Sequence, residues 1–216
     1  MVYAGRIGDE KISLGVSGRL QQSNLIMWDT QTNSLWSQIK GEALYGASKG
    51  KTLDMLPAVF VGLGTWKRMH PQTVVLDLPT VRQKNWYYTT DELRAGGVQS
   101  QGGLAELGVG LRHGSNTLAI PMATLQKEGI VQVKVGDVPL AVVWVDAESV
   151  PLVYDRRLGG QTLDLAFGGG ALQDRGDSFD PLTGEAADGG DSLSRFPYLP
   201  TYLSAWQTCY PNGRGR

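Results

Sequence analysis

With 216 residues, 41% of them hydrophobic and 19% charged, the chain is long enough to bury a substantial core and has a composition typical of a soluble globular protein. Its net charge of -1 gives no electrostatic reason to expect nucleic acid as a partner, because nucleic acid attracts clustered Lys and Arg. The single cysteine, Cys209, excludes an internal disulfide and a multi-thiolate metal site.

The first residues of the chain have the pattern of the interior of a strand. Residues 1–6 lack the basic start and apolar stretch of a signal peptide, and no apolar run reaches transmembrane length. We therefore expect no membrane insertion, and the sequence does not decide the compartment. A similar opening at Val153 is preceded by the apolar run Leu140–Val145, which predicts a buried strand. We expect that the first part of the chain lacks this leading strand and is truncated at its N-terminus.

A hairpin is predicted early in the chain. Residues 11–17 have strand-like composition. The apolar segments Leu25–Trp28 and Leu35–Trp36 flank a polar turn. Within that turn Asp29 and Thr32 can bind loop amides, and Asn33 suits a left-handed backbone position. The first interpretation of these residues is therefore a turn.

Helices are predicted at three places. Apolar residues at helical spacing between Pro57 and Pro71 predict a helix over 58–70, and the pattern over 200–209 is its counterpart. A third helix is predicted over 121–128. The glycine-dense stretch 95–110 is expected to be a flexible connection, and 184–190 a mobile loop.

Part of the sequence occurs twice. One constant offset of 151 residues (153 minus 2) relates the two stretches, and it joins Asp29 to Asp180 and Thr32 to Thr183. Further on the offset becomes 140 (206 minus 66), which relates Trp66 to Trp206. Matches in order over so long a separation favour duplication of a folding unit. The duplicated Trp66 and Trp206 are expected to be core residues.

These features predict an α+β fold of mainly antiparallel strands, built from two pseudo-symmetric copies of a strand-hairpin-helix unit. The first copy spans 1–80 and lacks its leading strand. A Gly-rich connection follows over 81–110. The second, degenerate copy spans 111–216 and includes its leading helix and strand.

The hairpin and its surroundings also carry a family resemblance. The segments that carry it most clearly are Gly15–Gly18, Ser23–Leu25, Met27–Asp29, Ser34–Gln38, Gly41–Ala43, Leu56–Pro57, Thr65–Trp66 and His70–Thr73, and the resemblance continues through Ala119–Val143 and more weakly after Tyr154. They closely resemble the bacterial and archaeal family defined by domain of unknown function 3179. The resemblance implies that many relatives are exported, and it transfers no activity, cofactor or substrate. Members carry a cysteine-containing strand just before the position of Tyr3, so chemistry of those thiols would be missing here.

Apparent motifs fail on spacing. Gly46–Thr52 looks like a phosphate loop, but the first glycine of that motif would fall on Tyr45. Gly15–Gly18 is one residue short of a nucleophile elbow. Asp174, Asp177 and Asp180 with Glu185 match no calcium loop. No cofactor or metal is therefore predicted.

The candidate site is what the first copy has and the second has lost. The shortlist is Asn24, Asp29, Trp36, Gln38 and His70, with Asp29 included as the turn carboxylate. These residues can form one site only if the helix ending at His70 packs beside the hairpin. The more ordinary interpretation of His70 is a helix C-terminal residue. For Trp36, the same offset places Ala187 in the second copy.

Three functions are compatible with these observations. The leading hypothesis is a non-catalytic ligand-binding or structural module, with an unidentified small molecule as the candidate partner. The alternative is a hydrolase-type enzyme with a single site around Asp29, Gln38 and His70, which would need a cleft and a hydrogen-bonded carboxylate. A small propeller-like scaffold, suggested by the hairpin, is third.

Overall fold

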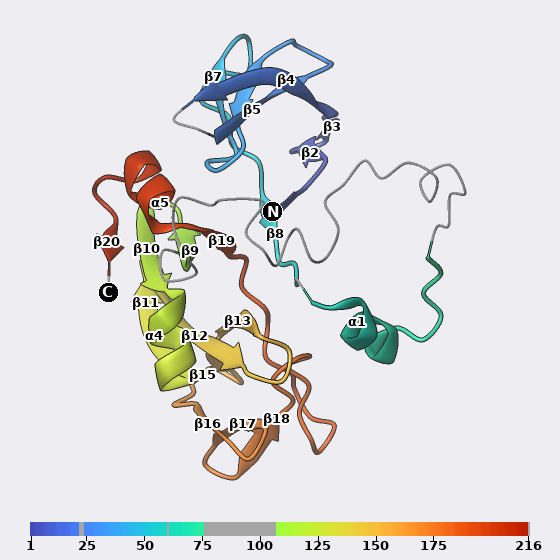
Figure 1. Ribbon diagram of the computed structural model, residues 1–216, viewed down its shortest axis with the longest axis vertical. Coiled ribbons are helices and arrows are strands. Elements are labelled where there is room, and N and C mark those ends of the chain that lie inside the picture. Colours follow the sequence, from blue (N-terminus) through green and yellow to red (C-terminus); the bar gives the residue numbers. More distant parts are fainter. Residues whose placement is uncertain (22–23, 60, 76–106, 216) are drawn as a thin grey trace, which may run out of the picture.

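Figure 1 shows a computed structural model that describes residues 1–21, 24–59, 61–75 and 107–215. Most of the described elements are antiparallel strands, and the described helices are α1 (Leu63–Met69), α4 (Met122–Glu128) and α5 (Leu203–Cys209). The fold is therefore α+β, as the sequence predicts.

The N-terminal part is a small four-stranded sheet with two short ladders beside it. In the sheet β4 (Leu14–Gln21), β5 (Asn24–Asp29), β6 (Leu35–Ser37) and β7 (Glu42–Tyr45) follow one another in antiparallel order. The ladders pair β1 (Val2–Tyr3) with β8 (Met55–Leu56), and β2 (Arg6–Ile7) with β3 (Glu10–Lys11). A small core lies beneath them and contains Ile12, Trp36, Ala43 and Leu53.

The centre of the molecule is the three-stranded sheet β11-β12-β13, formed by Ile130–Val135, Val138–Val145 and Val150–Asp155. Every residue of β12 is buried. Successive side chains of a strand point to opposite faces, so β12 contributes to two cores. Leu140 and Val142 belong to one core, and Ala141 and Val143 to the other. This confirms the buried strand expected over 140–145.

The first of these cores is covered by a hairpin and a helix. The hairpin is β9 (Leu107–His113) with β10 (Asn116–Pro121), and α4 follows it directly. On the hairpin's edges β19 (Leu199–Tyr202) pairs antiparallel with β9, and β20 (Arg214–Gly215) pairs parallel with β10. Figure 1 shows α5 beside the β9-β10 hairpin. The order of the four-stranded sheet is β19-β9-β10-β20.

The second core is covered by short strands of the C-terminal part. They are β14 (Arg157–Leu158), β15 (Gln161–Thr162), β16 (Ala166–Gly168), β17 (Ala171–Asp174) and β18 (Asp177–Phe179). Leu172 and Phe179 of these strands, and Leu163 between β15 and β16, are buried and pack with Val143 and Tyr154.

Three local predictions need correction. The helix predicted over 58–70 is the shorter α1, and the segment predicted as one helix over 200–209 is a strand followed by α5. Gly108 to Gly110 belong to the buried strand β9 and are not a flexible connection, whereas 76–106 lie outside the described residues. These glycines have a packing reason, because a Cβ at Gly110 would lie 2.3 Å from the Trp206 ring. Trp206 is buried as expected, but Trp66 is 39% exposed.

Candidate functional site

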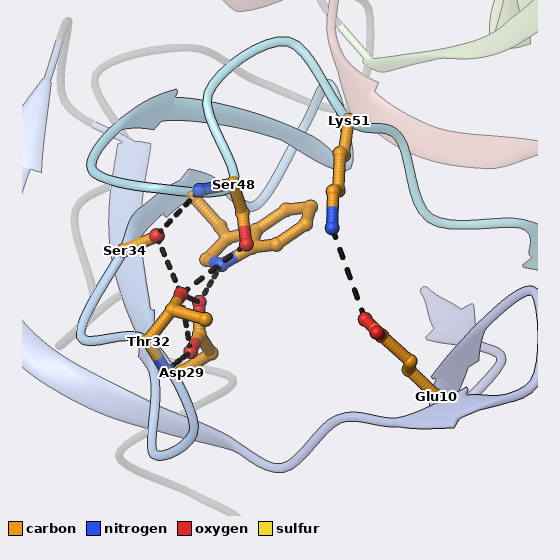
Figure 2. Close-up of polar contacts among 7 residues, drawn as sticks. Glu10, Asp29, Thr32, Ser34, Ser48 and Lys51 are labelled. Carbon is orange, nitrogen blue, oxygen red and sulfur yellow. Dashed lines mark hydrogen bonds and ion pairs between the residues drawn. The ribbon is translucent and has the colours of Figure 1, made fainter.

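The β5-β6 turn holds a buried carboxylate (Figure 2). Asp29 is fully excluded from solvent. Its oxygens accept the indole N–H of Trp36 at 2.8 Å, the Thr32 hydroxyl at 2.8 Å and the Thr32 backbone N–H. Burial opposes ionisation of Asp29, but the hydrogen bonds from Trp36 and Thr32 outweigh it, so the pKa of this carboxyl is below its usual value.

Hydroxyl groups extend this cluster to the next loop. The Thr32 hydroxyl lies 2.6 Å from that of Ser34 and 3.2 Å from that of Ser48, and the Ser48 backbone N–H donates to Ser34 at 3.0 Å. These contacts hold the loop over 46–50, which the sequence offered as an imperfect phosphate loop. The Asp29 carboxylate is hydrogen-bonded to Trp36 and Thr32, so the cluster stabilises the two turns.

The structure brings only part of the shortlist together. Asp29 and Trp36 are in direct contact. Asn24 is on β5, with its amide nitrogen 3.9 Å from the Cys209 sulfur of α5, and the Gln38 carbonyl accepts the Tyr3 hydroxyl at 2.6 Å. These two residues therefore touch α5 and β1.

His70 lies elsewhere, at the C-terminal end of α1. Its ring stacks on that of Trp66 with centroids 4.2 Å apart, and its backbone N–H donates to the Trp66 carbonyl at 2.8 Å. In Figure 1 α1 stands apart from the β4–β7 sheet. The helix does not pack beside the hairpin, so His70 is not part of the Asp29 cluster.

Trp36 is a core residue of the N-terminal part. It is a fully buried aromatic residue opposite Ala43 in the β6-β7 ladder. Phe179 is likewise buried and opposite Ala186. This pair corresponds to Trp28 and Leu35 at the offset of 151 (179 minus 28 and 186 minus 35), so Phe179 is the residue comparable with Trp28 and the offset still places Ala187 at the position of Trp36.

A hollow that the sequence did not reveal lies between the two parts of the chain. It has a volume of about 450 Å³ and is lined by three segments, Thr52–Met55, Arg112–Gly114 and Phe196–Pro197. Backbone hydrogen bonds hold the first and third of these segments. The Ala4 N–H donates to the Asp54 carbonyl at 2.8 Å, and the Phe196 N–H donates to the Val153 carbonyl at 2.8 Å. Strand β9 positions the middle one.

Arg112 and His113, two of the residues that line the hollow, have defined partners. Arg112 hydrogen-bonds to Tyr210, whose pKa is raised by burial and partly lowered again by this cation. His113 lies 3.2 Å from Asp137. The sequence signal that could have drawn attention here is the pair Arg112-His113 at the end of an apolar strand.

Three further observations concern metal binding and membrane crossing. Among residues 1–21, 24–59, 61–75 and 107–215, no three His, Cys, Asp or Glu side chains form a group able to hold a metal ion. Asp180, from the acidic stretch considered for calcium, binds the backbone N–H groups of Leu182 and Thr183 at 2.8 Å. Of the helices that the structure describes, none is long and apolar enough to cross a membrane.

Together these features define an α+β protein of mainly antiparallel strands, with a buried structural carboxylate and a hollow between its two parts. The family described as protein of unknown function DUF3179 matches residues 1–213. The chain belongs to this family. No curated protein and no solved structure matches the chain.

Proposed function

We propose that this protein is a non-catalytic ligand-binding module made of two copies of one folding unit, which binds a small organic anion in the hollow between them. The observation that carries the proposal is the lining of the hollow. The residues that line it include the apolar Leu53, Met55 and Phe196 and the cation Arg112, together with Asp54 and His113. Apolar walls with a few convergent polar groups are typical of small-molecule sites, which are often found at domain interfaces.

Matching strand registers support the duplication. Tyr3 pairs with Met55, and Tyr154 pairs with Arg195. The first members of these pairs differ by 151 residues (154 minus 3) and the second by 140 (195 minus 55). The neighbouring bonds repeat too, with Ala4 N–H donating to the Asp54 carbonyl at 2.8 Å and Asp155 N–H to the Ser194 carbonyl at 2.9 Å.

The short hairpins repeat in the same way. Arg6 pairs with Lys11 in the first part and Arg157 with Thr162 in the second, a shift of 151 for both members (157 minus 6 and 162 minus 11). A register this specific is set by turn geometry. Two unrelated segments have no physical reason to share it at a constant offset.

The same comparison supports a position of the hollow at the contact between the copies. Met55 belongs to the ladder beside β1, and Phe196 follows the bridge beside Tyr154. Equivalent segments thus line opposite sides of the hollow. A ligand here would contact both copies at once, which supports a single site per chain.

The ligand class follows from Arg112. Its guanidinium remains charged at all relevant pH values and presents a planar array of donors that matches a carboxylate. The hydrogen bond to Tyr210 restrains the side chain in the unliganded protein. A small carboxylate with an apolar body satisfies both the cation and the walls formed by Leu53, Met55 and Phe196.

Calorimetric titration with benzoate and hexanoate, with benzyl alcohol as the neutral probe, tests the proposal. We expect the carboxylates to bind and the alcohol to bind much more weakly. Arg112→Gln should weaken carboxylate binding about tenfold or more, because a charge-assisted bond is lost. The matched control is Arg175→Gln, since Arg175 is exposed and lies outside the hollow. No carboxylate binding, or binding insensitive to Arg112→Gln, would refute the proposed site.

The hydrolase alternative has less support. A general base must have a free lone pair within reach of the reacting proton, whereas the Asp29 oxygens are occupied by Trp36 and Thr32. His70 lies on α1 and stacks on Trp66. These contacts favour structural roles for both residues.

A further inference from the structure

Two helices of this chain end in the same way. In α1 the His70 backbone N–H donates to the Trp66 carbonyl at 2.8 Å, and in α5 the Tyr210 N–H donates to the Trp206 carbonyl at 2.8 Å. The rings of each pair are tilted alike, 4.2 Å apart at 45° in α1 and 4.5 Å apart at 46° in α5. Both helices have seven residues. They are therefore two examples of one local structure.

The surroundings of α5 show what this structure packs against. Leu203 and Trp206 lie on two glycines of the β9-β10 hairpin, and a Cβ would come within 2.4 Å of Leu203 at Gly108 and within 2.3 Å of Trp206 at Gly110. The chain after α5 then forms β20, which pairs parallel with β10. The partner of α5 is thus a hairpin with a glycine-x-glycine strand and an edge that accepts a parallel strand.

The corresponding surface of α1 is exposed. Leu63 is 56% and Trp66 39% exposed, and in the segment after the helix Val74 and Val75 are 90% and 61% exposed. Figure 1 shows α1 standing clear of the described sheets, whereas α5 lies beside β9 and β10. We call the surface formed by Leu63, Trp66, Val74 and Val75 the α1 docking face.

The opposite side of α1 is fixed to the rest of the protein. Thr65 donates its hydroxyl to Glu148, and Arg68 forms an ion pair with the same carboxylate at 2.7 Å. Val59 and Val61, just before the helix, pack against the second core. The docking face is therefore held in place before any partner arrives, which lowers the entropic cost of binding.

We propose that the α1 docking face binds a β-hairpin of a partner protein, one that carries glycine-x-glycine on the strand under α1. Leu63 and Trp66 would pack over the glycines, and Val74-Val75 would add to the partner's edge as a parallel strand. The features of this partner are inferred from the packing of the similar helix α5 on the β9-β10 hairpin of this chain. Strand addition supplies affinity through backbone bonds, and the glycines supply specificity.

One position makes the chain's own hairpin a poor fit for α1. A Cβ at Gly213 would lie 2.7 Å from the Thr117 hydroxyl of β10. The equivalent residue after α1 is Thr73, which has that Cβ and uses its hydroxyl to accept the Trp66 indole N–H at 2.8 Å. The partner hairpin must therefore carry a residue smaller than threonine at the position that Thr117 occupies in β10. This requirement disfavours a second copy of this chain as the partner.

The test uses the full chain and a disulfide-cyclised peptide with the sequence of residues 107–121 that carries Thr117→Gly. Fluorescence anisotropy of the labelled peptide should show saturable binding. Binding should weaken about tenfold or more with the protein variants Trp66→Ala or Leu63→Asp, because aromatic and apolar anchors dominate such contacts. Both residues are exposed, so circular dichroism should show unchanged folding. The peptide with Gly110→Val should not bind, and the peptide that retains Thr117 should bind more weakly.

Three outcomes would overturn the proposal. The first is no binding of the Thr117→Gly peptide to the wild-type chain. The second is binding that Trp66→Ala and Leu63→Asp leave unchanged. The third is a concentration-dependent dimer in analytical ultracentrifugation that Trp66→Ala dissociates, which would assign the face to a second copy. None of these results depends on carboxylate binding at Arg112.

Discussion

Trp36 donates its indole N–H to the carboxylate of Asp29 across 2.8 Å, and both side chains are completely buried. A buried carboxylate is costly unless it is hydrogen-bonded, and a buried indole N–H is costly unless it finds an acceptor. Each residue thus satisfies the other. The pair connects the turn after β5 to the core beneath β6, so it determines the stability of the N-terminal sheet.

Replacement of the carboxylate should reveal this role. Asp29→Asn should lower the free energy of unfolding by about 1–3 kcal/mol at pH 7, because the amide provides one acceptor where the donors need two. Urea unfolding measures the change. Asp180→Asn is the matched control, since Asp180 occupies a similar turn but is exposed, and its effect should be smaller.

The pH dependence has a definite sign. The pKa of Asp29 is lowered in the folded state, so its ionised form adds stability above the pKa of the unfolded carboxyl, about 3.9. That stability is lost as the pH falls below this value through the folded pKa. The wild type should therefore lose stability more steeply than Asp29→Asn on acidification. Parallel acid profiles of the two proteins would contradict this.

Trp36→Phe keeps most of the ring and removes only the donor. We expect a loss of about 1–3 kcal/mol from the unmet acceptor and the changed packing. The pKa of Asp29 should also rise, because burial raises it and the hydrogen bond from Trp36 that lowers it is gone. Acid unfolding should then begin at a higher pH. NMR titration of the Asp29 carboxyl measures the first effect. An unchanged pKa would show that Thr32 alone sets it.

Trp66 and Trp206 should respond differently to truncation. Trp206→Ala empties a buried position over Gly110 and should cost about 3–5 kcal/mol. Trp66→Ala should cost much less, because Trp66 is largely exposed and its main contacts are His70 and Thr73. Thermal unfolding of both variants compares them directly. Equal losses would mean that Trp66 is buried in solution.

Alkaline pH should destabilise the C-terminal part. Burial raises the pKa of Tyr154 and of Tyr198 to about 12, from the ordinary value of 10.0. Their neutral forms therefore add stability that is complete below pH 10 and is lost as the pH rises towards 12. Urea unfolding across this range, with phenolate absorbance, follows the loss. A Tyr154→Phe, Tyr198→Phe double variant should show a shallower decline, and an unchanged decline would exclude these groups.

Several predictions that depended on nearby residues are confirmed. The turn from Asp29 to Asn33 is formed as expected, with Thr32 bonded to Asp29 and Asn33 at a positive φ of 55°. The apolar run over 140–145 is a buried strand, and the helix predicted over 121–128 is α4. Turn chemistry and periodicity act over a few residues, so they are visible in the sequence.

Predictions about the site depended on distant contacts and were less successful. The shortlist contained Asp29 and Trp36, but their mutual hydrogen bond was not foreseen, and His70 was grouped with them although α1 packs elsewhere. Arg112 was not singled out, because nothing near it in the sequence indicates that Leu53 and Phe196 line the same hollow.

The sequence by itself determined the fold class, the hairpin turn and the family, since each depends on residue types in a fixed order. Tertiary structure decided the environments of the similar helices α1 and α5. Trp66 and Trp206 end their helices in the same local geometry, yet only Trp206 is buried, because only α5 lies on the glycines of β9. The environment of a side chain depends on which distant segment packs against it, and local pattern carries no information about that choice.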